Sequence, residues 1–349
     1  MVYLDYAATC PKVKYPCSKY GTFFNVNANY AYKEKKLLKD CEDRIKAAIG
    51  AKDGHVLYFR CATDALEWLA GKTYELDPIR DFAYSPYEHD ATTYGMCAMP
   101  DELDEMKFYC HQLVNQLTGQ IHNIKVVHEQ LLQYDEVPFL ICDCTAAIGK
   151  TSLKSAHVCS YADCICMSGH KIGCPDIAFM WVDDRLFDWL GGDNDVRNQY
   201  SLKHGSISVG HVLALADAVE WACDSKRLSD VDNEYMLLLY YLYRGLKRAD
   251  IDFSVITGME LSTCAINAIR LNGLNADALQ QYLASKQIYV SIGGSACAEK
   301  HDYRVLNAYG LSNDESSEVI RVSFGEDSSV EDVKALVEGI KNFKELYVK

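Results

Sequence analysis

Continuous apolar segments alternate with amphipathic segments along this 349-residue chain, and this alternation restricts the fold more than any other feature. Apolar stretches without polar alternation predict strands that are buried on both faces of a sheet. We therefore expect an α/β protein with a mainly parallel sheet. The clearest strand predictions are residues 56–59, 138–142, 164–167 and 177–182.

Two long helices are predicted beside these strands. Residues 33–49 place their apolar side chains on one stripe, and Gly50 follows as a typical helix terminator. Residues 206–224 have a second long helical pattern.

After about residue 250 the predicted elements become shorter, which indicates a second domain. We predict a large α/β domain over residues 16–250 and a small α+β domain formed by residues 1–15 and 251–349. The last helix is expected to begin near Ser329, with Asp332 as its capping-box partner. The other elements predicted in the small domain are strands at 264–271, 288–292 and 317–324 and a helix at 276–286.

The charge and hydropathy of the chain exclude several classes of function. A formal net charge of −14 disfavours direct binding to nucleic acid, because both surfaces are negative. No apolar run approaches the roughly 20 residues that cross a bilayer, and the first residues do not resemble a signal peptide. We expect a cytoplasmic protein without a membrane partner.

The chain has 15 cysteines but no C-x-x-C pair, so a zinc site is not indicated. In a cytosolic protein these thiols should be reduced. Cys142 with Cys144 and Cys164 with Cys166 are spaced to share one face of a strand. We interpret them as small buried apolar side chains, with metal ligation as the less favoured alternative.

The strongest local signal for chemistry is the segment Ser168-Gly169-His170-Lys171, directly after a predicted strand. In open α/β sheets, ligands bind at the carboxyl ends of the strands. A lysine at such a place can form a Schiff base with an aldehyde cofactor, and Ser168 and His170 offer hydrogen-bond donors for a phosphate. An ordinary surface lysine is the alternative.

Asp143 ends another apolar strand, where a carboxylate is unfavourable unless it is paired. The ring nitrogen of pyridoxal phosphate is a partner that such an aspartate can hold protonated. The alternative is an aspartate that caps a following helix.

A strand also passes into a helix at residues 59–65. The backbone amides at Ala62 and the hydroxyl of Thr63 can hold a phosphate at the start of that helix. Threonine is also a common helix cap, so this segment alone is a weak signal.

Seven segments of the chain resemble motifs of the NifS/IscS-type cysteine desulfurases, which have the class V aminotransferase fold. They follow the family's order and extend from residue 3 to residue 325, so the resemblance covers nearly the whole chain. The segments are Tyr3 to Thr9, Glu88 to Ala91, Asp143 to Lys150, Ser168 to Lys171, Lys203 to Ser206, Ser291 to Cys297 and Ile320 to Gly325.

The resemblance implies a fold type I enzyme that depends on pyridoxal 5'-phosphate, with Lys171 holding the cofactor and moving the proton of the substrate's alpha carbon. Asp143 would bind the ring nitrogen, and His89 would stack on the ring and assist proton transfer. Ser206 would reach the phosphate from the neighbouring subunit, which requires a homodimer. The other implied cofactor-binding residues are Ala62, Thr63, Gln116, Ser168 and His170.

The resemblance also implies a substrate and a reaction. Arg321 would clamp the carboxylate of L-cysteine, beside Gln116. The thiolate of Cys297 would attack the substrate's sulfur, which gives L-alanine and a persulfide for transfer to an acceptor protein. Without the resemblance, Cys297 reads as one more buried cysteine, Arg321 as a salt-bridged strand residue and His89 as a structural histidine.

Several positions depart from the family pattern. Ala146 replaces a glutamine, Lys203 replaces an arginine, and Gln116 stands at the place of an asparagine. The region of residues 90–115 is shortened. These departures leave two alternatives open beside a desulfurase: a lyase or aminotransferase acting on another amino acid, and a weakened member that serves as a binding protein.

Overall fold

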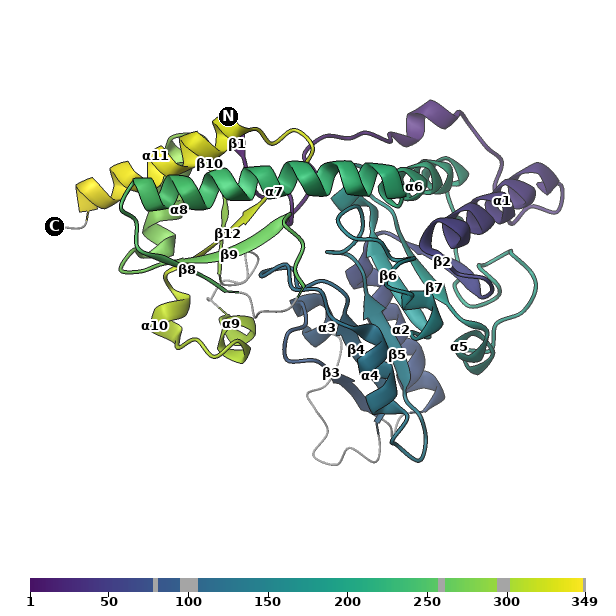
Figure 1. The fold of residues 1–349 in the computed structure, drawn as a ribbon. Helices are drawn as coiled ribbons and strands as arrows, with labels where there is room; N and C mark the ends of the chain where they lie inside the picture. Colours follow the sequence, from purple (N-terminus) through teal and green to yellow (C-terminus); the bar gives the residue numbers. More distant parts are fainter. Residues whose placement is uncertain (78–80, 95–105, 257–260, 294–301, 348–349) are drawn as a thin grey trace. The chain divides into compact units, whose positions relative to one another are not determined.

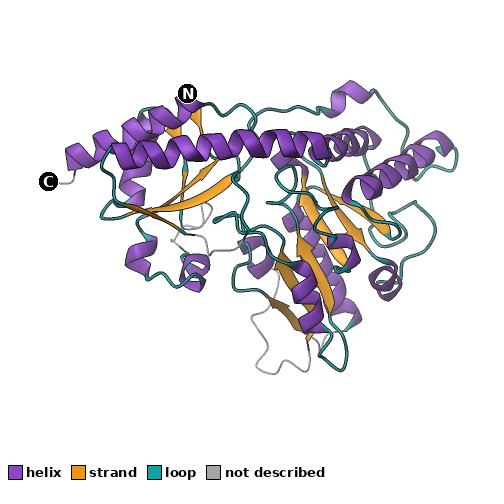
Figure 2. Cartoon of the chain, viewed as in Figure 1, coloured by secondary structure: helices purple, strands orange, loops and turns teal. Residues whose placement is uncertain are grey.

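A computed structural model describes residues 1–77, 81–94, 106–256, 261–293 and 302–347 (Figures 1 and 2). The chain divides into two compact units, each with its own hydrophobic core. The large unit consists of Pro11–Leu113 and Asn123–Leu228. The small unit consists of Met1–Cys10, Val114–His122 and Ser229–Lys349.

The large unit is built on a mixed sheet of six strands in the described residues. Strands β3, β4, β5 and β6 run parallel to one another, whereas β7 is antiparallel to both β6 and β2. The predicted α/β fold with a mainly parallel sheet is confirmed, and each predicted strand of this unit lies within one or two residues of its place. In spatial order the strands are β2 (His55–Phe59), β7 (Ala178–Val182), β6 (Cys164–Ser168), β5 (Phe139–Asp143), β4 (Met106–Gln112) and β3 (Asp81–Tyr84).

Helices pack beside this sheet, as Figure 2 shows. Helix α2 (Ala62–Leu76) contacts β2, β6 and β7, and α1 (Tyr32–Ile49) packs against α6 (Val209–Ala222). Gly50 ends α1 in the left-handed conformation and donates to the Lys46 carbonyl, as predicted. The remaining helical segments of the unit are η1 (Cys17–Tyr20), α3 (Asp90–Tyr94), α4 (Ile124–Leu131), η3 (Val158–Ser160), η4 (Gly169–Ile172) and α5 (Asp184–Trp189).

The predicted helix at 206–224 is wrong at both ends. Helix α6 begins at Val209, because Ser208 has extended backbone angles and acts as the cap residue. It ends at Ala222, and a separate helix, α7 (Ser225–Arg248), follows. The carboxylate of Asp224 accepts a 2.8 Å hydrogen bond from the Arg227 amide, which explains why a new helix starts there.

The small unit contains an antiparallel sheet in the order β11-β12-β9-β8 and a parallel pair of β1 with β10. The single strand predicted at 288–292 is wrong, because the segment divides at Val290 between these two sheets. The Val290 carbonyl instead accepts a 2.9 Å bond from the Gln280 side chain. The strands are β1 (Val2–Tyr3), β8 (Phe253–Val255), β9 (Ile266–Leu271), β10 (Ile288–Tyr289), β11 (Ser291–Ile292) and β12 (Val319–Ser323).

The predicted start of the last helix, α11, is confirmed in the small unit. Ser329 and Asp332 exchange backbone-to-side-chain hydrogen bonds of 2.9 and 3.2 Å in front of α11. Helix α7 approaches α11 closely at Gly245, where a side chain would meet Val337 at 2.9 Å. The other helices here are α8 (Ala276–Ser285), α9 (Arg304–Ala308) and α10 (Asn313–Ser316), followed by α11 (Val330–Tyr347).

The cysteines pack as predicted from their spacing. Cys164 and Cys166 share one face of β6 within the core of the large unit. The sulfurs of Cys142 and Cys144 lie 3.8 Å apart, and both side chains are fully buried. Across the described ranges, no group of three or more histidine, cysteine or acidic side chains is arranged to hold a metal. In the same ranges, none of the helices has the length and apolar character to cross a membrane.

Candidate functional site

Lys171 lies in the short turn η4, directly after the buried strand β6. The turn depends on Gly169, because a side chain there would come within 2.3 Å of the Cys174 carbonyl oxygen and 2.7 Å of the Ile177 carbonyl oxygen. Gly173 then closes the turn by donating to the Gly169 carbonyl. The half-buried Lys171 is thereby held at the carboxyl end of β6, where α/β sheets bind ligands.

Ser168 connects this strand end to the start of α2. Its buried hydroxyl accepts a 2.7 Å hydrogen bond from the Ala62 amide, and Thr63 follows half-buried in the first helical turn. Amides in the first turn of a helix have no partner within the helix and attract anions. A hydroxyl that accepts one hydrogen bond keeps its own hydrogen for donation, so Ser168 and Thr63 offer donors suited to a phosphate. The Ala62 amide expected to bind the phosphate instead donates to Ser168.

Asp143 ends β5, the strand beside β6. In the ladder between the two strands it lies opposite Cys166, two residues before Ser168. One carboxylate oxygen accepts a 2.8 Å hydrogen bond from the Thr145 amide. Residues 144–157, all of them described, contain no helix, so Asp143 stabilises a turn and does not cap a helix.

His170 has a strongly shifted pKa that identifies its neighbours. Burial, together with the smaller effects of the nearby Lys171, His89 and Lys150, lowers the pKa of its imidazole to about 4. The ring is therefore neutral at pH 7, with one nitrogen as a donor and the other as an acceptor. Lys150 ends the motif that begins at Asp143, but the sequence indicated no role for it. Its electrostatic effect on His170 places it, with Lys171 and His89, in a basic cluster around that ring.

His89 is exposed, and its position depends on the residue before it. The Nδ1 atom of His89 accepts a 3.0 Å hydrogen bond from the Ala91 amide, so Nε2 carries the proton of the neutral ring. Glu88 is fully buried, and its Oε1 accepts a 2.6 Å hydrogen bond from the Gln112 amide at the end of β4. Sequence reasoning missed this anchoring role of Glu88, although the residue stands in the motif that contains His89.

The segment before Lys203 and Ser206 has an unusual backbone. Four consecutive residues, Asn198 to Ser201, have positive φ angles of 49°, 48°, 63° and 62°. The Gln199 side chain accepts a 2.6 Å bond from the Tyr58 amide, and Lys203 donates to the Tyr58 carbonyl at 3.3 Å. These contacts satisfy the amide and carbonyl of Tyr58 on β2, an edge strand of the sheet in the described residues.

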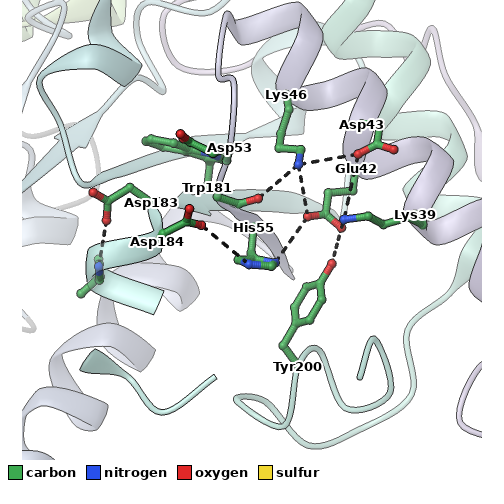
Figure 3. A network of polar contacts seen from close by, with 12 residues as sticks. Lys39, Glu42, Asp43, Lys46, Asp53, His55, Trp181, Asp183, Asp184 and Tyr200 are labelled. Atoms are coloured by element: carbon green, nitrogen blue, oxygen red, sulfur yellow. Dashed lines mark hydrogen bonds and ion pairs between the residues drawn. The ribbon is translucent and has the colours of Figure 1, made fainter. Parts of the chain in front are cut away.

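Tyr200 anchors the same segment in the interior, as Figure 3 shows. Its hydroxyl donates to the buried carboxylate of Glu42 on α1. Lys39 lies 3.2 Å from that carboxylate, and His55 approaches it at 3.8 Å while its ring stacks on Phe187. This network holds the segment that leads to Lys203. The Lys203 amine also lies 3.6 Å from the Asp64 carboxylate. Burial lowers the pKa of Lys203.

Ser206 is exposed at the end of this segment and accepts a 2.9 Å hydrogen bond from the Asn25 side chain. Ala146 is half-buried, one residue beyond the Thr145 that bonds to Asp143. Both positions belong to the large unit.

Arg321 is held in the small unit by several partners. It lies in β12 with 8% of its surface exposed. Its Nη2 atom donates to Asp5 Oδ1 at 2.7 Å and to Ser291 Oγ at 2.9 Å, and Nη1 donates to the Gln116 carbonyl at 3.1 Å. Ser291 also donates to the other Asp5 oxygen at 2.9 Å.

These bonds limit which nitrogen atoms of Arg321 are available to a further carboxylate. A guanidinium has two planar forks, Nε with Nη2 and Nη1 with Nη2, so both forks include the atom that already donates to Asp5. Nε is buried, and within the described residues it has no hydrogen-bond partner. The salt-bridged strand arginine considered from the sequence is therefore observed, with Asp5 as the partner. The N-terminal motif contained Asp5, but nothing in the sequence indicated this pairing.

Gln116 adjoins Arg321 through its main chain, and its half-buried side chain has an Oε1 atom without a partner in the described ranges. The fully buried Asn115 before it has a structural role, since its carboxamide oxygen accepts 2.9 Å bonds from the amides of Leu117 and Thr118. The small unit therefore joins Gln116 and Arg321. Cys297 lies outside the described residues.

Comparisons with known proteins agree on the family. The model of the aminotransferase class-V family matches residues 92–336. The chain is 25% identical to a cysteine desulfurase IscS of Actinobacillus succinogenes, over 98% of this chain and 92% of the relative. It is 22% identical to a putative cysteine desulfurase NifS of Halalkalibacterium halodurans, over 97% and 96% of the two chains.

Solved structures show the same fold. A NifS-like protein superposes with a TM-score of 0.79 at 19% identity, covering 99% of both chains. The apo structure of a cysteine desulfurase from Thermococcus onnurineus NA1 superposes with a TM-score of 0.75 at 18% identity, covering 99% of this chain and 94% of that one.

Proposed function

The chain belongs to the class-V aminotransferase family, and from this premise we propose that it is a cysteine desulfurase that depends on pyridoxal phosphate. The observation that carries the proposal is the place of Lys171, in a tight turn after β6, beside the strand that ends in Asp143. The names of the relatives, which match over nearly the full length of the chain, support cysteine as the substrate.

The residues of the large unit fit the cofactor. Asp143 offers a carboxylate for a protonated ring nitrogen, and Thr63 at the start of α2 with Ser168 and His170 offers donors for a phosphate. The basic cluster of Lys171, Lys150 and His89 suits the phosphate's negative charge. When bound, pyridoxal phosphate supplies a carbonyl that joins the substrate's amine and a ring that accepts electrons.

The side chains around it would perform the proton transfers. Lys171 would hold the cofactor and then move the proton at the substrate's alpha carbon. His89 would assist through Nε2, because its Nδ1 atom is engaged by the Ala91 amide. Glu88 keeps this loop fixed to the end of β4 and so orients His89.

Arg321 and Cys297 would act on the substrate itself. The carboxylate of L-cysteine would replace Asp5 at part of the Arg321 guanidinium, an exchange of one carboxylate for another. The Cys297 thiolate would then bond to the substrate's sulfur while the carbon–sulfur bond breaks. One sulfur atom passes to Cys297 as a persulfide and a proton replaces it on the carbon, which gives L-alanine without an external oxidant or reductant.

The experiment that tests this function uses purified protein loaded with pyridoxal phosphate and given L-cysteine and dithiothreitol. Sulfide and alanine should form in equal amounts. Lys171→Ala should form neither, whereas Lys154→Ala, at an exposed lysine, should match the wild type. Cys297→Ser should retain the absorbance of the bound cofactor and release no sulfide. Pyruvate and ammonia in place of alanine would contradict the proposal.

A lyase or aminotransferase acting on another amino acid is the second candidate, favoured by Ala146 in place of a glutamine. In that case Cys297→Ser would leave the turnover of the true substrate unchanged. A weakened member would show no absorbance of a bound cofactor. A homodimer in the cytoplasm, with Ser206 reaching the partner's cofactor and a protein as sulfur acceptor, belongs to the desulfurase proposal.

A further inference from the structure

Helix α7 presents an apolar patch to solvent in the small unit. The patch consists of Met236, Leu237, Tyr240 and Tyr241, which are 50%, 51%, 53% and 37% exposed. Their spacing places all four on adjacent turns of one helix face. The opposite face already packs into the core through Val231, Tyr235, Leu238, Leu242 and Leu246, so the exposed patch is a second apolar surface of the same helix.

Opposite charges flank this patch along the helix. Asp230 and Glu234 are exposed on its N-terminal side, and Arg244 and Arg248 are exposed on its C-terminal side. In the part of the chain that the structure describes, none of these four forms an ion pair; Arg244 donates at 2.6 Å to the Tyr240 hydroxyl. These acids and arginines are therefore available to pair with a partner surface that carries acids and arginines in the same arrangement.

The layout is symmetric about the level of Leu239. Glu234 and Arg244 lie five residues to either side of it, Asp230 and Arg248 nine, and Leu237 and Tyr241 two. An antiparallel second copy of the helix, centred at this level, would bring each acid level with the partner's arginine and Leu237 level with the partner's Tyr241. A two-fold contact requires such a self-complementary surface.

We propose that α7 pairs with α7 of a second copy in an antiparallel, two-fold contact formed by the apolar patch and its flanking charges. The apolar side chains provide the buried area, and the charges select the antiparallel direction, because a parallel pair would oppose like charges. Four apolar side chains per copy make a contact at the small end of specific interfaces, below about 1,200 Å² in total. The association is therefore weak and depends on concentration and salt.

The experiment is sedimentation equilibrium of the full-length protein over a wide range of concentrations. The average mass should rise to twice that of the species at the lowest concentration. Glu234→Arg should weaken this association at least tenfold, because the symmetric contact then opposes arginines twice. Leu237→Ser should weaken it similarly, whereas Glu338→Arg, at an exposed position of α11, should have no effect. Circular dichroism of every variant should match the wild type.

The decisive variant is the charge exchange Glu234→Arg with Arg244→Glu. Ten residues separate the two positions along the helix, so they do not meet within one copy. Association of the double variant should return to within about twofold of the wild type, because each new arginine again faces an acid of the other copy. A mass independent of concentration, or a double variant as weak as Glu234→Arg, would overturn the proposal. The outcome does not depend on the enzyme's activity. The α7 contact is also separate from the subunit contact expected at Ser206, because Ser206 belongs to the other unit.

Discussion

Ser168, the last residue of β6, accepts a 2.7 Å hydrogen bond from the amide of Ala62, the first residue of α2. The bond joins the strand that leads to Lys171 with the helix start that holds Thr63. Two segments more than one hundred residues apart in the sequence are thereby fixed in one donor group. Cofactor affinity and local stability should therefore depend on the same hydroxyl.

Replacement of Ser168 by alanine tests this dependence. The Ala62 amide would lose its acceptor in a buried place, which costs about 1–3 kcal/mol of unfolding free energy. The phosphate would lose a donor, so the affinity for pyridoxal phosphate should fall about tenfold. Urea unfolding and titration of the cofactor by absorbance measure the two effects. Ser155→Ala, at an exposed turn, should change neither, and unchanged cofactor affinity in Ser168→Ala would contradict the prediction.

His170 should make the apo protein less stable in mild acid. Burial lowers the pKa of its imidazole to about 4, below the roughly 6.5 of an unfolded histidine. Between these values the unfolded chain binds a proton that the folded chain does not, so this contribution is fully present above pH 6.5 and is lost as the pH falls towards 4. After allowance for the partly exposed ring, the loss should be about 1–2 kcal/mol.

The variant His170→Asn isolates this effect. The difference in unfolding free energy, variant minus wild type, should increase steadily as the pH is lowered from 6.5 to 4, because only the wild type loses the His170 contribution. Urea unfolding of both apo proteins at several pH values measures the difference. A difference that stays constant over this range would show that His170 does not titrate as its surroundings indicate.

The sequence predicted β2, β5, β6 and β7 of the large unit to within one residue at each end, because each one is an apolar run whose burial on both faces is visible locally. It did not predict β3 and β4, because the apolar runs at residues 82–84 and 108–110 are only three residues long. The segment at 288–292 shows where such reasoning fails. Its apolar pattern is continuous, yet Tyr289 ends the pairing with β1 and Ser291 starts the pairing with β12. Which sheet a short strand joins depends on distant partners, and no local pattern contains that information.

The candidate site shows the same division. Lys171, Asp143 and Thr63 were found because each stands at a strand end or a helix start, which the local pattern reveals. Asp5 and Glu88 were not assigned roles, since their partners, Arg321 and the Gln112 amide, lie 316 and 24 residues away. An acid's partner is decided by the three-dimensional arrangement, so the motif alone did not predict it.

The buried pair of Asp5 and Arg321 should contribute strongly to stability. Their side chains are only 17% and 10% exposed, so removing the acid leaves an uncompensated buried cation. Asp5→Asn should reduce the unfolding free energy by about 2–4 kcal/mol. Adding Arg321→Met to Asp5→Asn should cost less than the sum of the two single changes, because the partner of the lost acid is then absent as well.

A matched control is the exposed pair of Lys334 and Glu331, with an amine-to-oxygen distance of 3.5 Å and 65% and 78% exposure. Glu331→Gln should change the unfolding free energy by no more than about 0.5 kcal/mol. If the single changes at Asp5 and Arg321 are additive in urea unfolding, the two side chains are not coupled and the interpretation of this pair is wrong.

Two glycines of the small unit separate backbone conformation from steric conflict. Gly119 and Gly273 have nearly equal φ angles of +76° and +79°. A side chain at Gly119 would lie 2.3 Å from the Ile266 carbonyl oxygen and 3.1 Å from the Thr263 carbonyl oxygen, whereas nothing lies within 4 Å at Gly273. Alanine at Gly273 should therefore cost only the conformational penalty, about 1 kcal/mol.

Alanine at Gly119 should cost at least about 3 kcal/mol, because backbone atoms of β9 must move in addition. The change would also disturb the turn that holds Gln116, since Gly119 donates to the Asn115 carbonyl at 2.9 Å and its own carbonyl accepts from the Thr263 amide at 2.9 Å. Urea unfolding of the two variants compares the losses directly. Equal losses would mean that the chain relaxes around Gly119 and that the close approach to Ile266 does not restrict this position to glycine.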